Sequence, residues 1–383
     1  MSESTYESAL SRRRLLQGAG AVVASVGASP WLLETATAAA AEHKLGGTID
    51  YLSWQGYDSP KSFGPWLKAN NVKLKPTYIA THDDIQAKIL ALHGGKGYDI
   101  ITYYQGYKQL YDELKILTPL DESKIPNIKG LLPFFKGNYR GFWVKNGVRT
   151  AVPMYWGALG LVYDSKALPT APTSYKMLFT SAMKGKVTVD DDPVGVYTLA
   201  GHVLGINVAR MTPAQFAKVT TWLKALVKQS KGVAPSYGDC AKRIADGDAV
   251  VGFPGWAAQV GFAAGSGNKN VRFVLPKEGG YAYCDSWAIP ISADNAEAAY
   301  GYINNAIDPK VNANAAIEQI LGGVTVAGAV KYLDKQTRSL YNYGNLDSFF
   351  AKAPLYANPP LKSSNFVTID KVIAKWQEVK ASA

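Results

Sequence analysis

The 383-residue chain contains few of the side chains that bind metals or cross-link small folds. It has 2 cysteines and 4 histidines, which excludes a disulfide-rich scaffold and argues against a cysteine/histidine zinc site. Cys240 and Cys284 could pair in an oxidising compartment, but we favour two buried free thiols. Charged residues make up 19% of the chain and hydrophobic residues 47%, so there is enough apolar material for packed cores.

Signatures of common enzyme and nucleotide-binding sites are also missing. The sequence lacks the H-E-x-x-H, G-x-S-x-G and G-x-x-x-x-G-K-S/T patterns, so we expect neither an enzyme nor a cofactor. Residues 190–192 are consecutive aspartates, which could suggest a metal. We interpret them as a solvated strand end and a helix cap before Pro193, and we expect no metal site.

Positive charge is in excess but is not concentrated. The chain has 41 lysines and arginines against 30 aspartates and glutamates, a net charge of +11. These basic residues are spread singly among acidic ones, which predicts a solvated surface and no nucleic-acid partner. Aromatic residues make up 11% of the chain, and they could line a ligand pocket or fill a core.

Residues 1–41 are typical of an export signal. Three arginines at 12–14 precede a weakly apolar run at 18–33 and an alanine-rich stretch at 36–41. This order predicts a twin-arginine signal that is cleaved near Ala41. A membrane anchor is the alternative, but the apolar run is shorter than the ~20 residues of a spanning helix, and no later segment reaches that length without charges. We therefore expect the mature protein in the periplasm.

Strand-like and helix-like segments alternate along the rest of the chain. Residues 47–52 and 98–102 have the patterns of strands, whereas 83–92 and 367–379 carry the apolar stripes of helices. A threonine and a proline at 212–213 begin the clearest helix. The alternation predicts an α/β fold with mostly parallel strands. No single position divides the chain, which suggests that it passes between two domains more than once.

Several segments occur in the order that is found in one protein family. They span residues 51–57, 97–104, 151–164, 276–290 and 302–309. The most specific of them contains Pro-Lys-Glu-Gly-Gly followed by Asp-Ser-Trp-Ala-Ile-Pro. Together the segments cover most of residues 45–330. They resemble the polyamine-binding (spermidine/putrescine) branch of bacterial ABC-transporter substrate-binding proteins, in the type II periplasmic solute-binding superfamily.

The resemblance implies a two-lobed α/β fold of the Venus-flytrap type, with mixed, mostly parallel sheets and a central cleft. It places residues 42–155 and 286–330 in lobe 1, and residues 156–285 and 331–383 in lobe 2. It further implies a monomer that captures a polyamine-like ligand and delivers it to an ABC permease in the membrane.

A polyamine is a flexible apolar chain with two or more ammonium groups. Its site needs carboxylates at the charged points and aromatic walls along the methylenes, because a cation over an aromatic ring gains ~0.5–2 kcal/mol. Comparison with the family pattern, position by position, suggests two carboxylates and several aromatic residues as ligand contacts. These are Asp192, Asp285, Trp54, Tyr57, Tyr104, Trp156, Phe253, Trp256 and Tyr283.

Several of these residues have a structural alternative. Trp54 and Tyr57 could pack around a turn, and Trp156 could pack at the hinge. Trp256 is of a type that more often lies in the core than against a ligand. Asp285 could cap a turn, although a buried acid favours a cation nearby.

Two glycines depart from the family pattern. Gly195 stands where spermidine binders often place a second acid, and Gly323 stands where a tyrosine is usual. The site is therefore expected to be less acidic and more open, so a shorter diamine, a monocation or a bulkier amine is an alternative ligand. The +11 charge and Gly195 also favour a rival hypothesis, an anion such as a carboxylate or phosphonate. A secreted enzyme with Asp192 and Asp285 as its acid pair is the third hypothesis.

Overall fold

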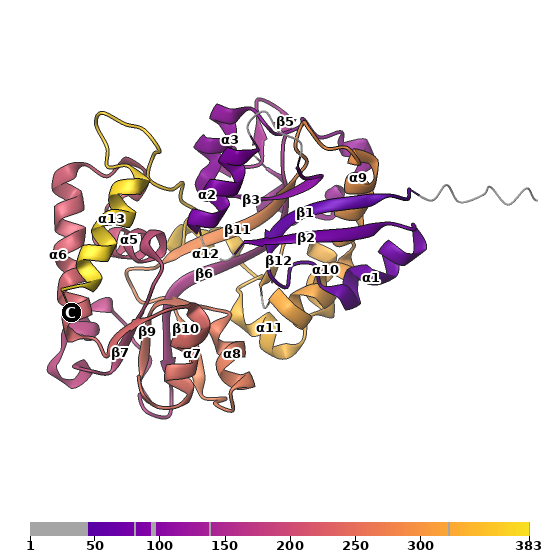
Figure 1. Cartoon of the computed structure of the whole chain (residues 1–383). Helices are drawn as coiled ribbons and strands as arrows, with labels where there is room; N and C mark the ends of the chain where they lie inside the picture. The colour runs from indigo at the N-terminus through magenta and orange to yellow at the C-terminus, as the bar shows by residue number, and fades with distance from the viewer. Residues whose placement is uncertain (1–44, 80–81, 93–96, 138, 321, 383) are drawn as a thin grey trace, which may run out of the picture. The chain divides into compact units, whose positions relative to one another are not determined.

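The computed structural model describes residues 45–79, 82–92, 97–137, 139–320 and 322–382, and the predicted export signal lies outside these ranges. Within them, one large sheet runs through the chain (Figure 1). Its strands are β1 (Thr48–Trp54), β2 (Lys73–Ile79), β3 (Ile100–Tyr104), β6 (Val152–Asp164), β7 (Val187–Asp190), β8 (Gly232–Ala234), β9 (Val251–Trp256), β10 (Val271–Val274), β11 (Tyr281–Ala288) and β12 (Gly323–Val324). A separate hairpin consists of β4 (Val144–Lys145) and β5 (Val148–Arg149).

Helices cover both flanks of the sheet. They are α1 (Pro60–Ala69), α2 (His82–Ala91), α3 (Lys108–Leu114), α4 (Pro133–Lys136), α5 (Pro193–Val203), α6 (Pro213–Gln229), α7 (Tyr237–Ala245), α8 (Gln259–Gly265), α9 (Ala296–Ala306), α10 (Pro309–Ala315), α11 (Lys335–Leu340), α12 (Leu346–Lys352) and α13 (Ile369–Lys380). On one flank α5, α6 and α13 pack together, and on the other α1 packs on α9 and α10 (Figure 1). None of the described helices combines the length and the apolar character that a bilayer crossing requires.

The sheet has the order β2-β1-β3-β11-β6-β9-β7-β8, and β10 and β12 also pair with β6. Parallel pairing is found on the flanks, where β1 pairs with β2 and β3, and β7 pairs with β8 and β9. The central strands β6 and β11 are antiparallel to their neighbours. The alternating pattern of the sequence therefore predicts the flanks correctly, whereas the centre is antiparallel because the chain crosses it in opposite directions.

Two large hydrophobic cores share the crossing strands. Strand β6 is buried along its whole length. Its apolar side chains belong to the first core up to Ala158 and to the second from Leu159, except Val162, which lies in a smaller third cluster. Strand β11 changes core between Tyr281 and Ala282. The expected two-lobed α/β architecture is thus present. We propose that the first two crossings lie where β6 and β11 change core.

The C-terminal tail divides between the cores later than expected. Tyr341 and Phe350, on either side of the α11–α12 connection, pack in the first core, whereas Val372 and Trp376 of α13 pack in the second. The predicted assignment of all residues 331–383 to lobe 2 therefore does not match the packing. We propose that the third crossing follows Leu355, although Ile369, at the start of α13, still packs in the first core.

Local sequence signals explain where the elements that carry the site begin and end. Helix α6 begins at Pro213, and the Thr212 and Gln215 side chains cap each other's backbone N–H groups as a capping box. Strand β3 is shifted by two residues from the predicted 98–102, so that Tyr104 is its last residue. The two thiols, Cys240 and Cys284, are buried, unpaired and in different core clusters, as the favoured alternative predicted.

Candidate functional site

Asp285 is a buried carboxylate in the middle of the sheet. It lies on β11 opposite Tyr104 of β3, and its residue is 4% exposed. The Trp54 indole Nε1 donates a hydrogen bond to Asp285 Oδ1 at 3.2 Å, and the Tyr57 hydroxyl donates to Oδ2 at 2.7 Å. The structure therefore brings together three residues that the sequence predicted as site residues.

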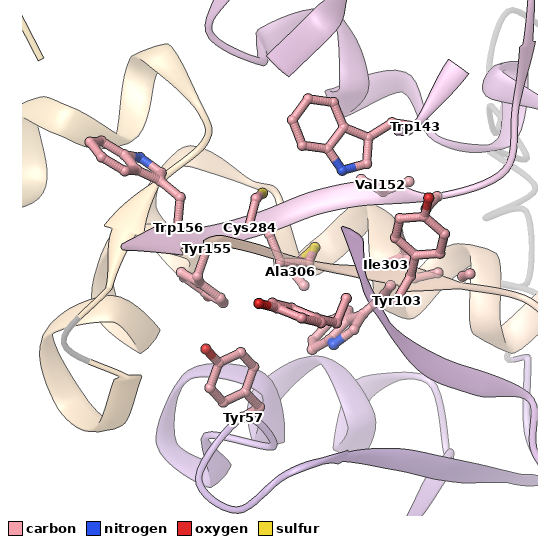
Figure 2. Close-up of a cluster of buried hydrophobic side chains, with 14 of the residues drawn as sticks. Tyr57, Tyr103, Trp143, Val152, Tyr155, Trp156, Cys284, Ile303 and Ala306 are labelled. Atoms are coloured by element: carbon pink, nitrogen blue, oxygen red, sulfur yellow. The ribbon is translucent and has the colours of Figure 1, made fainter. Parts of the chain in front are cut away.

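The two donors reach Asp285 because they surround the end of β1. Trp54 is the last residue of the strand, and the backbone N–H of Tyr57 bonds to the Trp54 carbonyl in the following turn. The Tyr57 ring meets the edge of the Tyr155 ring at 5.8 Å between centroids (Figure 2). Burial, followed by the nearby Asp285 charge, raises the pKa of Tyr57 well above its usual value. At neutral pH Tyr57 is therefore a neutral donor.

Asp192 is the second buried carboxylate, and it follows β7. Its Oδ1 accepts a hydrogen bond from the Gly195 N–H at 2.9 Å and caps α5. Its Oδ2 accepts a hydrogen bond from the Tyr237 hydroxyl at 2.8 Å. One oxygen thus stabilises the helix start, whereas the other lies beside an aromatic donor, as in the arrangement around Asp285.

The neighbouring aspartates have different partners. Asp191 binds Lys380 Nζ at 2.7 Å and the Trp376 indole Nε1 at 2.7 Å, which ties α13 to the end of β7. Asp190 is 1% exposed and accepts a long hydrogen bond from Gln259. Among the described residues, no group of three or more histidine, cysteine, aspartate and glutamate side chains could hold a metal ion. The three consecutive aspartates, residues 190–192, therefore have three different sets of partners.

Two tyrosines connect the carboxylates. Tyr104 lies opposite Asp285 on the neighbouring strand. Burial raises the pKa of Tyr104, and the charges of Asp192 and Asp285 add to the effect. Tyr283 of β11 packs against both cores, and its hydroxyl accepts a hydrogen bond from the Trp256 indole Nε1 at 2.7 Å. The candidate site thus lies where the two cores adjoin.

Two predicted contacts lie in the cores instead. Trp156 is fully buried, its indole Nε1 donates to the Val324 carbonyl at 3.0 Å, and Phe350 packs against its ring. Neighbouring strand residues face opposite sides, and Figure 2 shows Tyr155 directed toward Tyr57 while Trp156 points the other way.

Phe253 is likewise fully buried, and it belongs to the second core. Its ring packs against Trp222 of α6 and Tyr175. In this structure Trp156 and Phe253 therefore pack in the two cores, and their role as a ligand wall stays a prediction.

The two glycine positions are also filled differently from the expectation. A Cβ atom at Gly323 would lie 2.5 Å from the Trp156 ring, and one at Gly195 would lie 2.2 Å from Asp192 Oδ2. The missing side chains therefore do not leave open space at these positions. The Trp156 ring occupies the space beside Gly323, and the Asp192 carboxylate occupies the space beside Gly195.

Sequence reasoning missed Tyr237, the hydroxyl partner of Asp192. Strands β7 and β8 are parallel, with Asp190 opposite Ala234, so the residues that follow them meet at the same edge of the sheet. Recognition of β8 would have placed Tyr237 near Asp192. The strand is only 3 residues long and contains a glycine, so its pattern was too short to identify.

The buried tyrosines predict a steep loss of stability in alkali. Burial is the main cause that raises the pKa of Tyr57, Tyr237 and Tyr283 well above the value of the unfolded chain. Their stabilising contribution is complete below the unfolded pKa of about 10 and is lost as the pH rises above it. We expect the free energy of unfolding to fall above that pH, with most tyrosinate absorbance appearing only as the protein unfolds. Gradual ionisation of all tyrosines in a folded protein would contradict this.

The chain is similar to periplasmic binding proteins of known ligand class. The putrescine-binding periplasmic protein SpuD of Pseudomonas aeruginosa is 25% identical over 297 residues, which cover 72% of this chain and 77% of the relative. The spermidine/putrescine-binding periplasmic protein of Escherichia coli is 25% identical over 265 residues, which cover 69% and 74%.

A solved structure has the same fold. The Tp0655 (TpPotD) lipoprotein of Treponema pallidum aligns with a TM-score of 0.73 at 21% identity, over 88% of this chain and 100% of that one. This likeness confirms the two-domain periplasmic binding protein fold that the sequence predicted. Residues 61–339 match the family described as bacterial extracellular solute-binding protein. The match covers most of the chain, which therefore belongs to the bacterial extracellular solute-binding protein family.

Proposed function

We propose that this protein captures a polyamine-like cation with two charged ends and delivers it to an ABC permease. Family membership makes the chain an extracytoplasmic solute-binding protein rather than an enzyme. The observation that carries the ligand proposal is the pair of buried carboxylates, Asp285 and Asp192, each held by an aromatic hydroxyl. The names of the relatives, which specify putrescine and spermidine, support the same class of ligand.

The chemistry of the Asp285 end suits an ammonium group. The Trp54 and Tyr57 donors are neutral, so they orient the carboxylate without cancelling its charge. An ammonium group that reaches a preoriented, desolvated carboxylate gains a strong hydrogen bond. The indole and phenol rings provide apolar surface for the methylenes and, where a cation lies over a ring, an attraction of ~0.5–2 kcal/mol.

The anion hypothesis finds less support at this site. It rests on the net charge of +11 and on the absence of an acid at Gly195. Asp285 and Asp192 are both nearly buried, with 4% and 8% of their surface exposed. An anion between two such carboxylates would be repelled by both, whereas a diamine places one positive charge near each.

Transport explains why the site is divided between two lobes. Asp285 and its donors belong to the first lobe, whereas Asp192 and Tyr237 belong to elements that pack with the second. A ligand that touches both ends stabilises the form in which the lobes meet. We further propose that the chain acts as a monomer and reaches the periplasm by the twin-arginine route.

Calorimetric titration with a panel of solutes tests the ligand class. We expect 1,4-diaminobutane to bind, spermidine to bind more weakly, and succinate and a short alkylphosphonate to produce no heat of binding. Tryptophan fluorescence is expected to change with the diamine, because Trp54 lies against Asp285, and Trp54→Phe is expected to reduce that change. Binding of the acids with no response to any amine would reject the polyamine proposal.

A further inference from the structure

We propose that Gln259 is a positioning residue that holds the Asp192 end of the proposed amine site, an inference that rests on the proposed function. Gln259 is the first residue of α8 and is fully buried. Its Oε1 accepts a hydrogen bond from the Trp256 backbone N–H at 2.8 Å, and its Nε2 donates to the Tyr237 carbonyl at 2.8 Å. A longer bond, at 3.4 Å, joins Nε2 to Asp190 Oδ2.

One amide therefore connects the elements that carry both aromatic donors. Tyr237 begins α7 and donates its hydroxyl to Asp192, whereas Trp256 ends β9 and donates its indole N–H to Tyr283. Gln259 contacts neither of these side chains through their polar ends. It bonds to the backbone of both residues, so it sets the distance between the points from which their side chains project.

The pattern requires an amide at this position. The Trp256 N–H needs an acceptor and the Tyr237 carbonyl needs a donor, and only a side chain with both groups satisfies the two. Glutamate would place an oxygen against the Tyr237 carbonyl, and methionine would leave both backbone groups unsatisfied. Asp190 also lies against the amide, and burial favours its neutral form because it raises the Asp190 pKa.

The role of Gln259 is confined to one end of the site. Its hydrogen-bond partners, Trp256, Tyr237 and Asp190, lie on β9, α7 and β7, whereas Asp285 is held by Trp54 and Tyr57 from the end of β1. Loss of the amide is therefore expected to weaken a ligand that needs both carboxylates more than a ligand with a single ammonium group. A general loss of stability would weaken both ligands equally.

The test compares Gln259→Met with Gln215→Met in the full chain. Gln215 also accepts a backbone hydrogen bond, from Thr212 N at 2.9 Å, but it caps α6 away from the site. We expect Gln259→Met to lower the affinity for 1,4-diaminobutane about tenfold, an effect of the size of one lost hydrogen bond. The affinity for butylamine is expected to change by less than about twofold. Gln215→Met is expected to change the affinity for either ligand by no more than about twofold.

A second measurement needs no ligand. The indole N–H resonance of Trp256, assigned through Trp256→Phe, is expected to shift in Gln259→Met and to stay in place in Gln215→Met. If Gln259→Met does not fold, Gln259→Glu replaces it, because glutamate keeps the acceptor for the Trp256 N–H. Equal losses for both amines, or an unmoved resonance, would overturn the role of Gln259. If the resonance shifts in Gln259→Met but the wild-type protein binds no amine, the proposed function is rejected and the positioning role of Gln259 stands.

Discussion

Replacing Asp285 with asparagine is expected to weaken the binding of 1,4-diaminobutane by at least about 30-fold, the lower limit for removing one partner of a buried charge pair. The side chain is nearly buried, so water would compensate little for the lost carboxylate. Asparagine keeps one acceptor oxygen, which can still receive a hydrogen bond from Tyr57 or Trp54. The fold is therefore expected to survive, and calorimetric titration of the folded variant measures the affinity.

Asp164→Asn is the matched control for this change. Asp164 is also a buried aspartate, and its oxygens accept hydrogen bonds from Lys166 N at 2.7 Å and Asn268 Nδ2 at 2.9 Å. It lies at the far end of β6, away from the candidate site. Affinity within about twofold of wild type is expected for the control. If Asp285→Asn binds the diamine as well as the control does, Asp285 is not an ammonium contact.

Trp156→Ala is expected to lower the free energy of unfolding by about 3–5 kcal/mol, the usual cost of removing a fully buried large aromatic side chain. The indole ring is surrounded by Phe350, Phe349 and Tyr341, with centroid distances of 5.0, 5.1 and 4.8 Å. Its removal leaves a cavity and deletes the hydrogen bond to the Val324 carbonyl. Guanidinium unfolding measures the loss.

Trp222→Ala provides the comparison, because Trp222 is only half-buried and packs against Phe179 and Phe253 on the outer side of the second core. We expect a smaller loss of stability for this variant. Trp156→Phe, which keeps a ring in the core, is expected to bind the diamine as wild type does. Unchanged stability together with lost diamine affinity in Trp156→Ala would restore Trp156 as a ligand wall.

The Asp285 group could be predicted because its members are close to strand ends that the sequence marks clearly. Trp54 ends β1 and Tyr104 ends β3, and both strands pair in parallel, so their carboxyl ends meet at one edge. Asp285 was found through the resemblance of its segment to a family pattern. Its position opposite Tyr104 depends on antiparallel pairing between β11 and β3, which local patterns do not specify.

The sequence alone does not determine which side of a strand a side chain faces. Trp156 and Phe253 are aromatic residues on strands that are buried on both faces, so periodicity does not distinguish the side that faces the site from the side that faces the core. The positions of α11 and α12 were missed for a related reason. Tyr341, which follows α11, and two phenylalanines of α12 pack around Trp156, a contact between segments that are far apart in sequence.

The sequence by itself determines the order of strands and helices and the resemblance to a family. It also determines that acidic and aromatic side chains are present for the site. These properties depend on short-range patterns and ordered motifs. The tertiary structure alone decided which carboxylates lie beside which hydroxyls, and which of three consecutive aspartates points toward Tyr237. It also decided that Gln259 joins Tyr237 to Trp256. These pairings depend on strand register and on the packing of distant elements, so no local pattern encodes them.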